Sequence, residues 1–237
     1  MQPYFFPYLG YFQLIAAADC FVVYDNVQFI KRGWIERNRY LLQAEPRWFG
    51  VSLAKASQTQ QIIEKRLAAD HNPLECLEKL ANAYRRAPHV ERTLAWLKPL
   101  LERPADNIAE FNQRLLLACC ELTGINTPMI KASELIPHAA SKGQQRIIEL
   151  VEAVGGTHYL NPVGGQDLYN AADFEHAGIR LEFLQPALPP YAQSGSAQAF
   201  VPGLSIIDAL MHNEPDVVGQ LTRLGHIGPA ESGPSAR

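Results

Sequence analysis

The chain has 237 residues, of which 47% are hydrophobic, so it is long enough to bury the core of one large domain. Its net charge of −3 excludes a general attraction to nucleic acid or to an anionic membrane surface. No apolar run reaches the roughly 18 residues of a membrane-spanning helix. A signal peptide begins with a positively charged stretch, and no Lys or Arg precedes Lys31. We therefore expect a cytoplasmic protein.

Aromatic side chains crowd residues 4–12, which also contain Pro7 and Gly10. Because proline fixes φ and glycine relaxes it, we expect a shaped turn here rather than a regular helix or strand. Helical spacing follows at Phe12 and Ile15. Residues 21–24 are continuously apolar, which predicts a buried strand, and Asp25 follows at its carboxyl end.

The sequence opens on Met1-Gln2-Pro3, directly before the aromatic turn. The strand predicted at residues 21–24 is apolar on both alternations, which is typical of an interior strand with a neighbour on each side. We therefore expect Met1 to be the last residue of a further short apolar strand, whose earlier residues lie upstream.

Residues 27–39 mix cations with Trp34 and Asn38; the cations are Lys31, Arg32, Arg37 and Arg39. Arginine makes paired hydrogen bonds to phosphate or carboxylate, so this mixture suits an anionic or sugar-like ligand. A solvated basic loop is the alternative. Residues 48–53 then predict a second strand.

Residues 72–123 lose the strand pattern and show three apolar stripes at helical spacing. Asn72-Pro73 is a helix start, and the third helix begins near Asp106 or Asn107 and ends at Gly124. We expect an all-helical insertion over this segment, with its stripes in the core.

The α/β alternation resumes after the insertion, with strands expected at residues 127–131, 158–160 and 180–184. Ser141 is the expected cap of one helix, and a closing helix begins at Ser205. The predicted fold is α/β, with a mostly parallel central sheet flanked by helices. Residues 1–227 would form a single domain, and residues 228–237 a disordered tail.

Three kinds of feature could carry chemistry. Ser141-Lys142-Gly143 at a helix start suits a bound anion, and Gly164-Gly165 after Asn161 lets the backbone approach a ligand closely; a helix cap and a tight turn are the favoured alternative explanations. Asp19, Asp25 and Asp208 are carboxylates expected near apolar surroundings. The four cysteines and seven histidines show no metal-binding or catalytic spacing, so we expect no metal site.

Six blocks in this order resemble the WbqC-like family. They are residues 2–15, residues 19–25, Trp34 with Arg37-Asn38-Arg39, residues 141–143, residues 159–165 and residues 204–208 with Asn213. The resemblance implies a place in bacterial O-antigen or surface-polysaccharide biosynthesis. It also implies a glycyl or amino-acyl transferase that acts on amino sugars. It names no catalytic residues and no cofactor.

The leading hypothesis is therefore a transferase that joins an acyl or amino-acyl group to the amine of an amino sugar, which could be nucleotide-linked. Asp25 is the expected base. The expected substrate-binding residues, brought to one cleft from both halves of the chain, are Gln2, Tyr4, Tyr8, Tyr11, Trp34, Arg37, Asn38, Ser141, Lys142, Asn161, Gly164 and Gly165. We expect a small-molecule partner, no nucleic acid and no membrane insertion.

Two alternatives stay open. Tyr8-Leu9-Gly10-Tyr11 has the spacing of the HxGH loop of nucleotidylyltransferases, with tyrosines in place of both histidines, so a nucleotide-binding ligase or nucleotidylyltransferase-like enzyme is possible. The third hypothesis is a non-catalytic sugar-binding scaffold.

Overall fold

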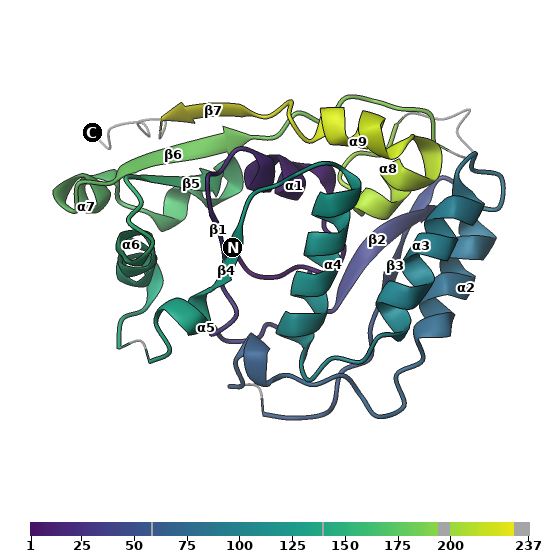
Figure 1. The fold of residues 1–237 in the computed structure, drawn as a ribbon, viewed down its shortest axis with the longest axis horizontal. Helices are drawn as coiled ribbons and strands as arrows, with labels where there is room; N and C mark the ends of the chain where they lie inside the picture. The colour runs from purple at the N-terminus through teal and green to yellow at the C-terminus, as the bar shows by residue number, and fades with distance from the viewer. Residues whose placement is uncertain (58, 139, 194–199, 230–237) are drawn as a thin grey trace.

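The computed structural model describes residues 1–57, 59–138, 140–193 and 200–229 (Figure 1). Its α-helices are α1 (Leu9–Ala16), α2 (Pro73–Ala83), α3 (Val90–Glu102), α4 (Ile108–Leu122), α5 (Ala132–Leu135), α6 (Gly143–Ala153), α7 (Ala171–His176), α8 (Ile206–His212) and α9 (Pro215–Leu221). Two 3₁₀ helices are η1 (Ile62–Glu64) and η2 (Val163–Leu168). The strands are β1 (Phe21–Val23), β2 (Arg37–Leu42), β3 (Glu45–Gly50), β4 (Met129–Lys131), β5 (His158–Pro162), β6 (Arg180–Gln185) and β7 (His226–Pro229).

The described strands form three small sheets. β1 pairs with β4 in parallel, β2 pairs with β3 antiparallel, and β6 lies between parallel β5 and antiparallel β7. The fold is mixed α/β, as the sequence predicts. The prediction of one mostly parallel central sheet is only loosely met, because no sheet has more than three strands within the described residues.

The apolar runs located four strands correctly, since β1, β4, β5 and β6 coincide with predicted segments. Three expectations need correction. The strand expected at residues 48–53 lies at Glu45–Gly50, residues 37–39 belong to β2 rather than to a loop, and Leu9 to Phe12 already belong to α1. The proline signal therefore marks the residues before the helix, whereas Gly10 lies in the first turn of α1.

Residues 72–123, all of which the structure describes, form α2, α3 and α4 and contain no strand, as predicted. Asn72 caps α2 by accepting from the Leu74 amide, and Asn107 caps α4 by accepting from the Glu110 amide. Phe111, Leu115 and Leu116 of α4 are fully buried in the main core. The helical segment thus shares its core with the α/β body rather than forming a separate unit.

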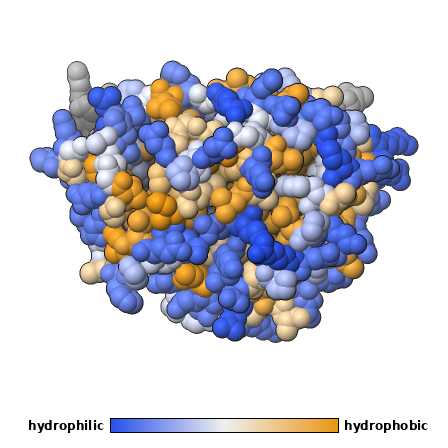
Figure 2. All heavy atoms as spheres, viewed as in Figure 1, coloured by the Kyte–Doolittle hydropathy of each residue, from blue (hydrophilic) through white to orange (hydrophobic). Residues whose placement is uncertain are grey.

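Two hydrophobic clusters support the fold. The large one joins the aromatic turn, α1, β1, the helical segment and α8. The small one lies under α6, α7, β5 and β6 and contains Ile148, Val151, Phe174, Ile179, Leu181 and Phe183. On the face of the molecule that Figures 1 and 2 present, apolar side chains also reach the surface between hydrophilic ones (Figure 2).

Two further expectations differ from the structure. The cap position of α6 is Lys142 rather than Ser141, and the helix begins at Gly143, whose φ is +57°. Gly228 and Pro229, expected in the tail, pair with β6 as part of β7, and the rest of the tail lies outside the described residues. Among the described residues, no helix is long and apolar enough to cross a membrane.

Candidate functional site: an aromatic cavity

The aromatic turn sorts its rings between the core and the surface. Phe5 and Phe6 are fully buried, whereas Tyr4 and Tyr8 are partly exposed. The turn is possible because Phe6 has a φ of +39°, a region that side chains other than glycine rarely adopt. Two buried side chains hold it: Asn38 Nδ2 donates to the carbonyls of Phe5 (3.0 Å) and Phe6 (2.8 Å), and Ser205 Oγ donates to that of Phe6 (2.7 Å).

A cavity of about 260 Å³ lies on the outer side of this turn. It is lined by Tyr4, Pro7, Tyr8, Trp34, Asn38, Arg39 and Gly203. Four of the predicted binding residues therefore converge: Tyr4, Tyr8, Trp34 and Asn38. Aromatic walls with a few polar groups are typical of a small-molecule site.

Cations alternate with aromatic rings beside the cavity. The guanidinium carbon of Arg39 lies 5.6 Å from the Trp34 ring, Trp34 packs on Trp48 at 5.3 Å, and Arg37 lies 4.1 Å over Trp48. Within the described residues, Nε of Arg39 is buried without a hydrogen-bond partner, and no carboxylate forms an ion pair with this guanidinium. Arg39 is therefore available to an anionic group.

The two cavity phenols act as hydrogen-bond donors at neutral pH. Burial, and then the neighbouring Tyr8, raises the pKa of Tyr4 above its usual 10.0. Burial raises the pKa of Tyr8 as well. Both hydroxyls stay protonated, so they suit the oxygens of a sugar or phosphate rather than the role of a base.

A second cavity of about 450 Å³ is lined by residues 28–31 and by Glu36, which lie before and after Trp34 in the sequence. Three lysines line it, Lys31, Lys55 and Lys65, together with Glu36. The ammonium of the buried Lys65 donates to the Ala54 carbonyl at 2.6 Å and keeps two further protons. Lys31 is three residues from Trp34, so their Cα atoms lie within roughly 11 Å of one another.

The predicted carboxylates do not face either cavity. Asp25 is fully buried, and its two oxygens accept from the amide (2.9 Å) and hydroxyl (2.5 Å) of Ser133. Asp208 is also fully buried, and Tyr84, Tyr191 and Gln193 donate to it. Asp19 is exposed. The two buried carboxylates therefore tie elements together, and a catalytic role for Asp25 stays a prediction.

Three predicted residues in the first half lie beside the cavity without lining it. The hydroxyl of the buried Tyr11 donates to the Gln2 carbonyl at 2.5 Å, which fixes the start of the aromatic turn. Arg37 Nη2 donates to the Arg32 carbonyl at 2.6 Å. These groups support the cavity rather than facing its interior.

The predicted substrate-binding residues of the second half line neither of these two cavities, nor the third one that lies between β1 and β5. Ser141 Oγ is bonded to Glu149, and Lys142 is exposed. Asn161 is buried and accepts from the Tyr159 hydroxyl at 3.2 Å. A Cβ at Gly165 would overlap the Asn161 side chain, whereas Gly164 has open space around it. The expected single cleft is not visible as one cavity.

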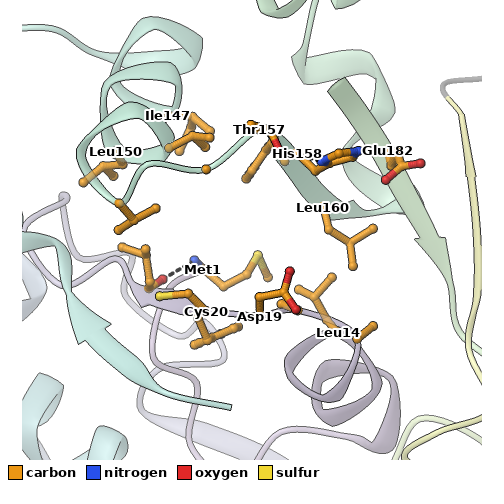
Figure 3. A pocket seen from close by; sticks show the side chains of 18 of the residues that line it. Met1, Leu14, Asp19, Cys20, Ile147, Leu150, Thr157, His158, Leu160 and Glu182 are labelled. Carbon is orange, nitrogen blue, oxygen red and sulfur yellow. Dashed lines mark hydrogen bonds between the residues drawn. The ribbon is translucent and has the colours of Figure 1, made fainter. Parts of the chain in front are cut away.

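The third cavity, of about 570 Å³, lies between β1 and β5 (Figure 3). Cys20, Asp19, His158 and Glu182 line it, among apolar side chains. Burial raises the pKa of the Cys20 thiol, so the nucleophilic thiolate is disfavoured. His158 Nδ1 bonds to the neighbouring Thr157 hydroxyl at 2.9 Å rather than to the thiol. This arrangement does not activate a nucleophile.

Sequence reasoning missed two wall residues of the aromatic cavity, Pro7 and Gly203. The sequence shows Arg39 only as one of several cations in residues 27–39, but Arg39 is the cation that lines the cavity. Its Nη2 donates to the Gly203 carbonyl at 3.2 Å. Gly203 has a φ of +69°, so the only sign of its position in the sequence is a glycine that could form a turn. No group of side chains suited to a metal ion occurs among the described residues.

Comparison with known proteins identifies the family of the chain. The chain is 27% identical over 215 residues to an uncharacterized protein, Rv1507c, of Mycobacterium tuberculosis (strain ATCC 25618 / H37Rv); the match covers 90% of this chain and 91% of that protein. No solved structure matches. The model of the WbqC-like protein family matches residues 2–219, so the chain belongs to the WbqC-like protein family.

Proposed function

We propose that the aromatic cavity binds an amino sugar, carried on a nucleotide, and that the protein transfers a glycyl, amino-acyl or acyl group to its amine. Surface-polysaccharide (O-antigen) biosynthesis in the bacterial cytoplasm is the setting that we propose for this reaction. The observation that carries the proposal is Arg39 between the aromatic walls of the cavity, because within the described residues it forms no ion pair and its buried Nε has no hydrogen-bond partner.

The ligand class follows from the cavity walls. Tyr4, Tyr8 and Trp34 offer flat apolar faces and two donors, which suit a sugar ring or a base. Arg39 and the nearby lysine cavity suit a phosphate or diphosphate. Both cavities border the segment from Gln28 to Arg39, so one extended ligand would reach from the aromatic walls to the lysines.

The chemical step needs a base to take a proton from the sugar ammonium. Asp25 remains our proposed candidate, and it would act only if a movement of Ser133 freed one of its oxygens. Binding is therefore the part of the proposal that the geometry supports best, and a non-catalytic sugar-binding scaffold is the form that it takes if turnover is absent.

Binding can be tested with calorimetry on a panel of nucleotide-linked amino sugars, using Arg39→Gln and Trp34→Ala. Loss of a charge-assisted hydrogen bond should weaken binding by roughly tenfold or more in Arg39→Gln. Arg47→Gln is the matched control, because Arg47 is exposed in the adjacent strand and, among the residues that the structure describes, forms an ion pair only with Glu45. Equal affinities for Arg39→Gln and Arg47→Gln, or no binding in the whole panel, would refute the proposal.

A second candidate is nucleotide activation. Tyr8 precedes the first turn of α1, where no side chain caps the helix and no acidic residue lies in the first turn, so a phosphate could approach its amides. Turnover that requires ATP and magnesium, with release of pyrophosphate, would favour this candidate over acyl transfer. Turnover with a pre-activated acyl donor alone would favour the first.

A further inference from the structure

One face of the β2–β3 hairpin carries two guanidinium groups beside two indoles. Arg39 of β2 pairs with Trp48 of β3, and Arg37 lies two residues before Arg39, so these three side chains share a face of the hairpin. Trp34, in the turn before β2, packs on Trp48 with the ring centres 5.3 Å apart. We call these four residues, Arg37, Trp48, Trp34 and Arg39, the arginine–tryptophan strip.

Both indoles of the strip are exposed to solvent. Trp34 exposes 38% of its surface and Trp48 exposes 45%. Tryptophan has a large apolar area, so two exposed indoles in contact form an apolar patch that is typical of a binding surface. The third tryptophan, Trp96 of α3, packs against the main core instead.

Gly50 leaves room for the strip. It pairs with Arg37 across the hairpin, and a Cβ at this position would overlap the Glu36 carbonyl oxygen and the Arg37 side chain. Because no side chain lies there, the Arg37 guanidinium can lie diagonally over the Trp48 ring, 4.1 Å from its centre.

The two arginines of the strip carry charges that no carboxylate neutralises in the part of the chain that the structure describes. Each guanidinium donates one hydrogen bond to a backbone carbonyl, and in both Nε is buried without a partner. Glu36 and Glu45, the carboxylates nearest in the sequence, bond to other groups. Arg37 and Arg39 are two strand residues apart, with Cα atoms roughly 6.6 Å from each other, so both can reach the oxygens of one diphosphate.

We propose that the strip binds the nucleoside diphosphate part of the ligand, with the base stacked on Trp48 and the diphosphate bound by Arg37 and Arg39. Trp34 and Arg39 also line the aromatic cavity, so a sugar attached to the diphosphate enters that cavity. The base and the sugar then occupy separate places. The position of the sugar rests on the proposed function, whereas the binding of a nucleoside diphosphate does not.

The strip predicts that different bases are tolerated. Stacking uses the flat face that every base has, whereas selection among bases needs hydrogen bonds to the base edge. The neighbours of Trp48 in β3, Arg47 and Phe49, point to the opposite face of the strand, so they do not reach the edge of a base stacked on Trp48. We therefore expect the protein to distinguish its ligands by the sugar rather than by the base.

The strip can be tested by calorimetry on the full chain with uridine diphosphate, adenosine diphosphate and pyrophosphate. Both nucleoside diphosphates should bind with similar affinity and more tightly than pyrophosphate, because only they can stack. Trp48→Ala should weaken the binding of both by about 5- to 150-fold and leave the affinity for pyrophosphate unchanged. Trp48→Phe keeps a flat ring and should retain most of the affinity.

Arg47→Gln is the control in the same strand and should bind all three ligands like the wild type. Tryptophan fluorescence separates a ring contact from a structural effect of the substitutions. A stacked base quenches the emission of the indole beneath it, so uridine diphosphate should quench the wild type more strongly than Trp48→Phe. Trp34 and Trp96 emit in both proteins and provide the common background.

Equal affinity of the wild type and Trp48→Ala for both nucleoside diphosphates would overturn the proposal. So would nucleoside diphosphates that bind no more tightly than pyrophosphate, or affinities for the two bases that differ by more than about tenfold. Tighter binding of a single-stranded oligonucleotide would overturn it in favour of a polynucleotide. None of these ligands contains an amino sugar, so the strip can fail while sugar binding persists, and it can hold while transfer to an amino sugar fails.

Discussion

At the scale of single residues, the shape of the cavity depends on Asn38, which was predicted from the sequence as a ligand-binding side chain. Its amide donates to two backbone carbonyls of the strained turn, and its carbonyl oxygen accepts from the Arg39 amide at 2.7 Å. Asn38→Ala leaves the Phe5 carbonyl without its side-chain donor in a buried site. We expect a loss of about 2 kcal/mol and a Tm roughly 4–8 °C lower.

Thermal melting checks this, with Ser205→Ala as the comparison. Ser205 supplies one of the three bonds to the turn and also caps α8 by accepting from the Ile207 amide, so its loss should cost about as much as that of Asn38. The idea that these side chains hold the turn fails if Asn38→Ala melts at the wild-type temperature.

Where the amino group of Met1 is free, its burial makes stability depend on pH. Burial lowers its pKa from 8.0 to about 5. Between these values the unfolded chain binds a proton that the folded chain does not, so the free energy of unfolding falls as pH drops from 8 to 5. The fall is at most about 4 kcal/mol, and the stability is fully present above pH 8. Urea titrations across this range should show it for the free amine. A chain acetylated at Met1 should lack that contribution, and identical pH profiles for both would contradict it.

At the scale of elements, the β2–β3 hairpin has a turn that its sequence disfavours. Leu42 pairs with Glu45, so Gln43 and Ala44 form a two-residue loop with φ values of +53° and +63°. Such turns usually contain Asn-Gly. The double variant Gln43→Asn, Ala44→Gly should stabilise the protein by roughly 1 kcal/mol, measured by urea unfolding. Ala153→Gly at an exposed position of α6 is the control and should destabilise it. A loss of stability in the double variant would show that this turn is not strained.

The same hairpin shows where sequence reasoning stops. Continuous apolar runs identified β1, β4, β5 and β6, and the capping residues Asn72 and Asn107 located two helix starts, because these signals are local. β2 begins with the polar residues Arg37, Asn38 and Arg39, so only its second half is apolar, and its turn lacks the usual glycine. Its strand form comes from pairing with β3 and from burial of Tyr40 and Leu41, which are properties of the folded molecule.

The candidate site was predictable only in part for a similar reason. Tyr4, Tyr8, Trp34 and Asn38 lie close in sequence to the turn that positions them, and they do converge. Gly203 reaches the cavity from the other end of the chain, because the Arg39 carbonyl accepts from the Ser205 amide at 2.9 Å. No periodicity in the sequence encodes that contact. For Asp25, the sequence shows a carboxylate at the end of a strand, but it does not show that this carboxylate is bonded to Ser133 inside the protein.

At the scale of the whole molecule, the two hydrophobic clusters should differ in stability. The large cluster crosses the aromatic turn, α4 and α8, whereas the small one is confined to residues 147–183 and lies beyond the open cavity. Fewer buried contacts mean a smaller free energy of local opening. We therefore expect the amides of α6, α7, β5 and β6 to exchange hydrogen faster than those of α4 and α8.

Two matched substitutions separate local from global opening. Leu116→Ala, in the large cluster, should lower the free energy of unfolding by about 2–5 kcal/mol and speed exchange throughout the protein. Phe174→Ala, which also removes a fully buried side chain, should speed exchange mainly in residues 143–185 and leave α4 and α8 protected. Exchange followed by mass spectrometry at increasing urea distinguishes the two cases. If Phe174→Ala accelerates exchange equally in α4 and in β6, the two clusters unfold as one cooperative unit and the division at the cavity has no energetic meaning.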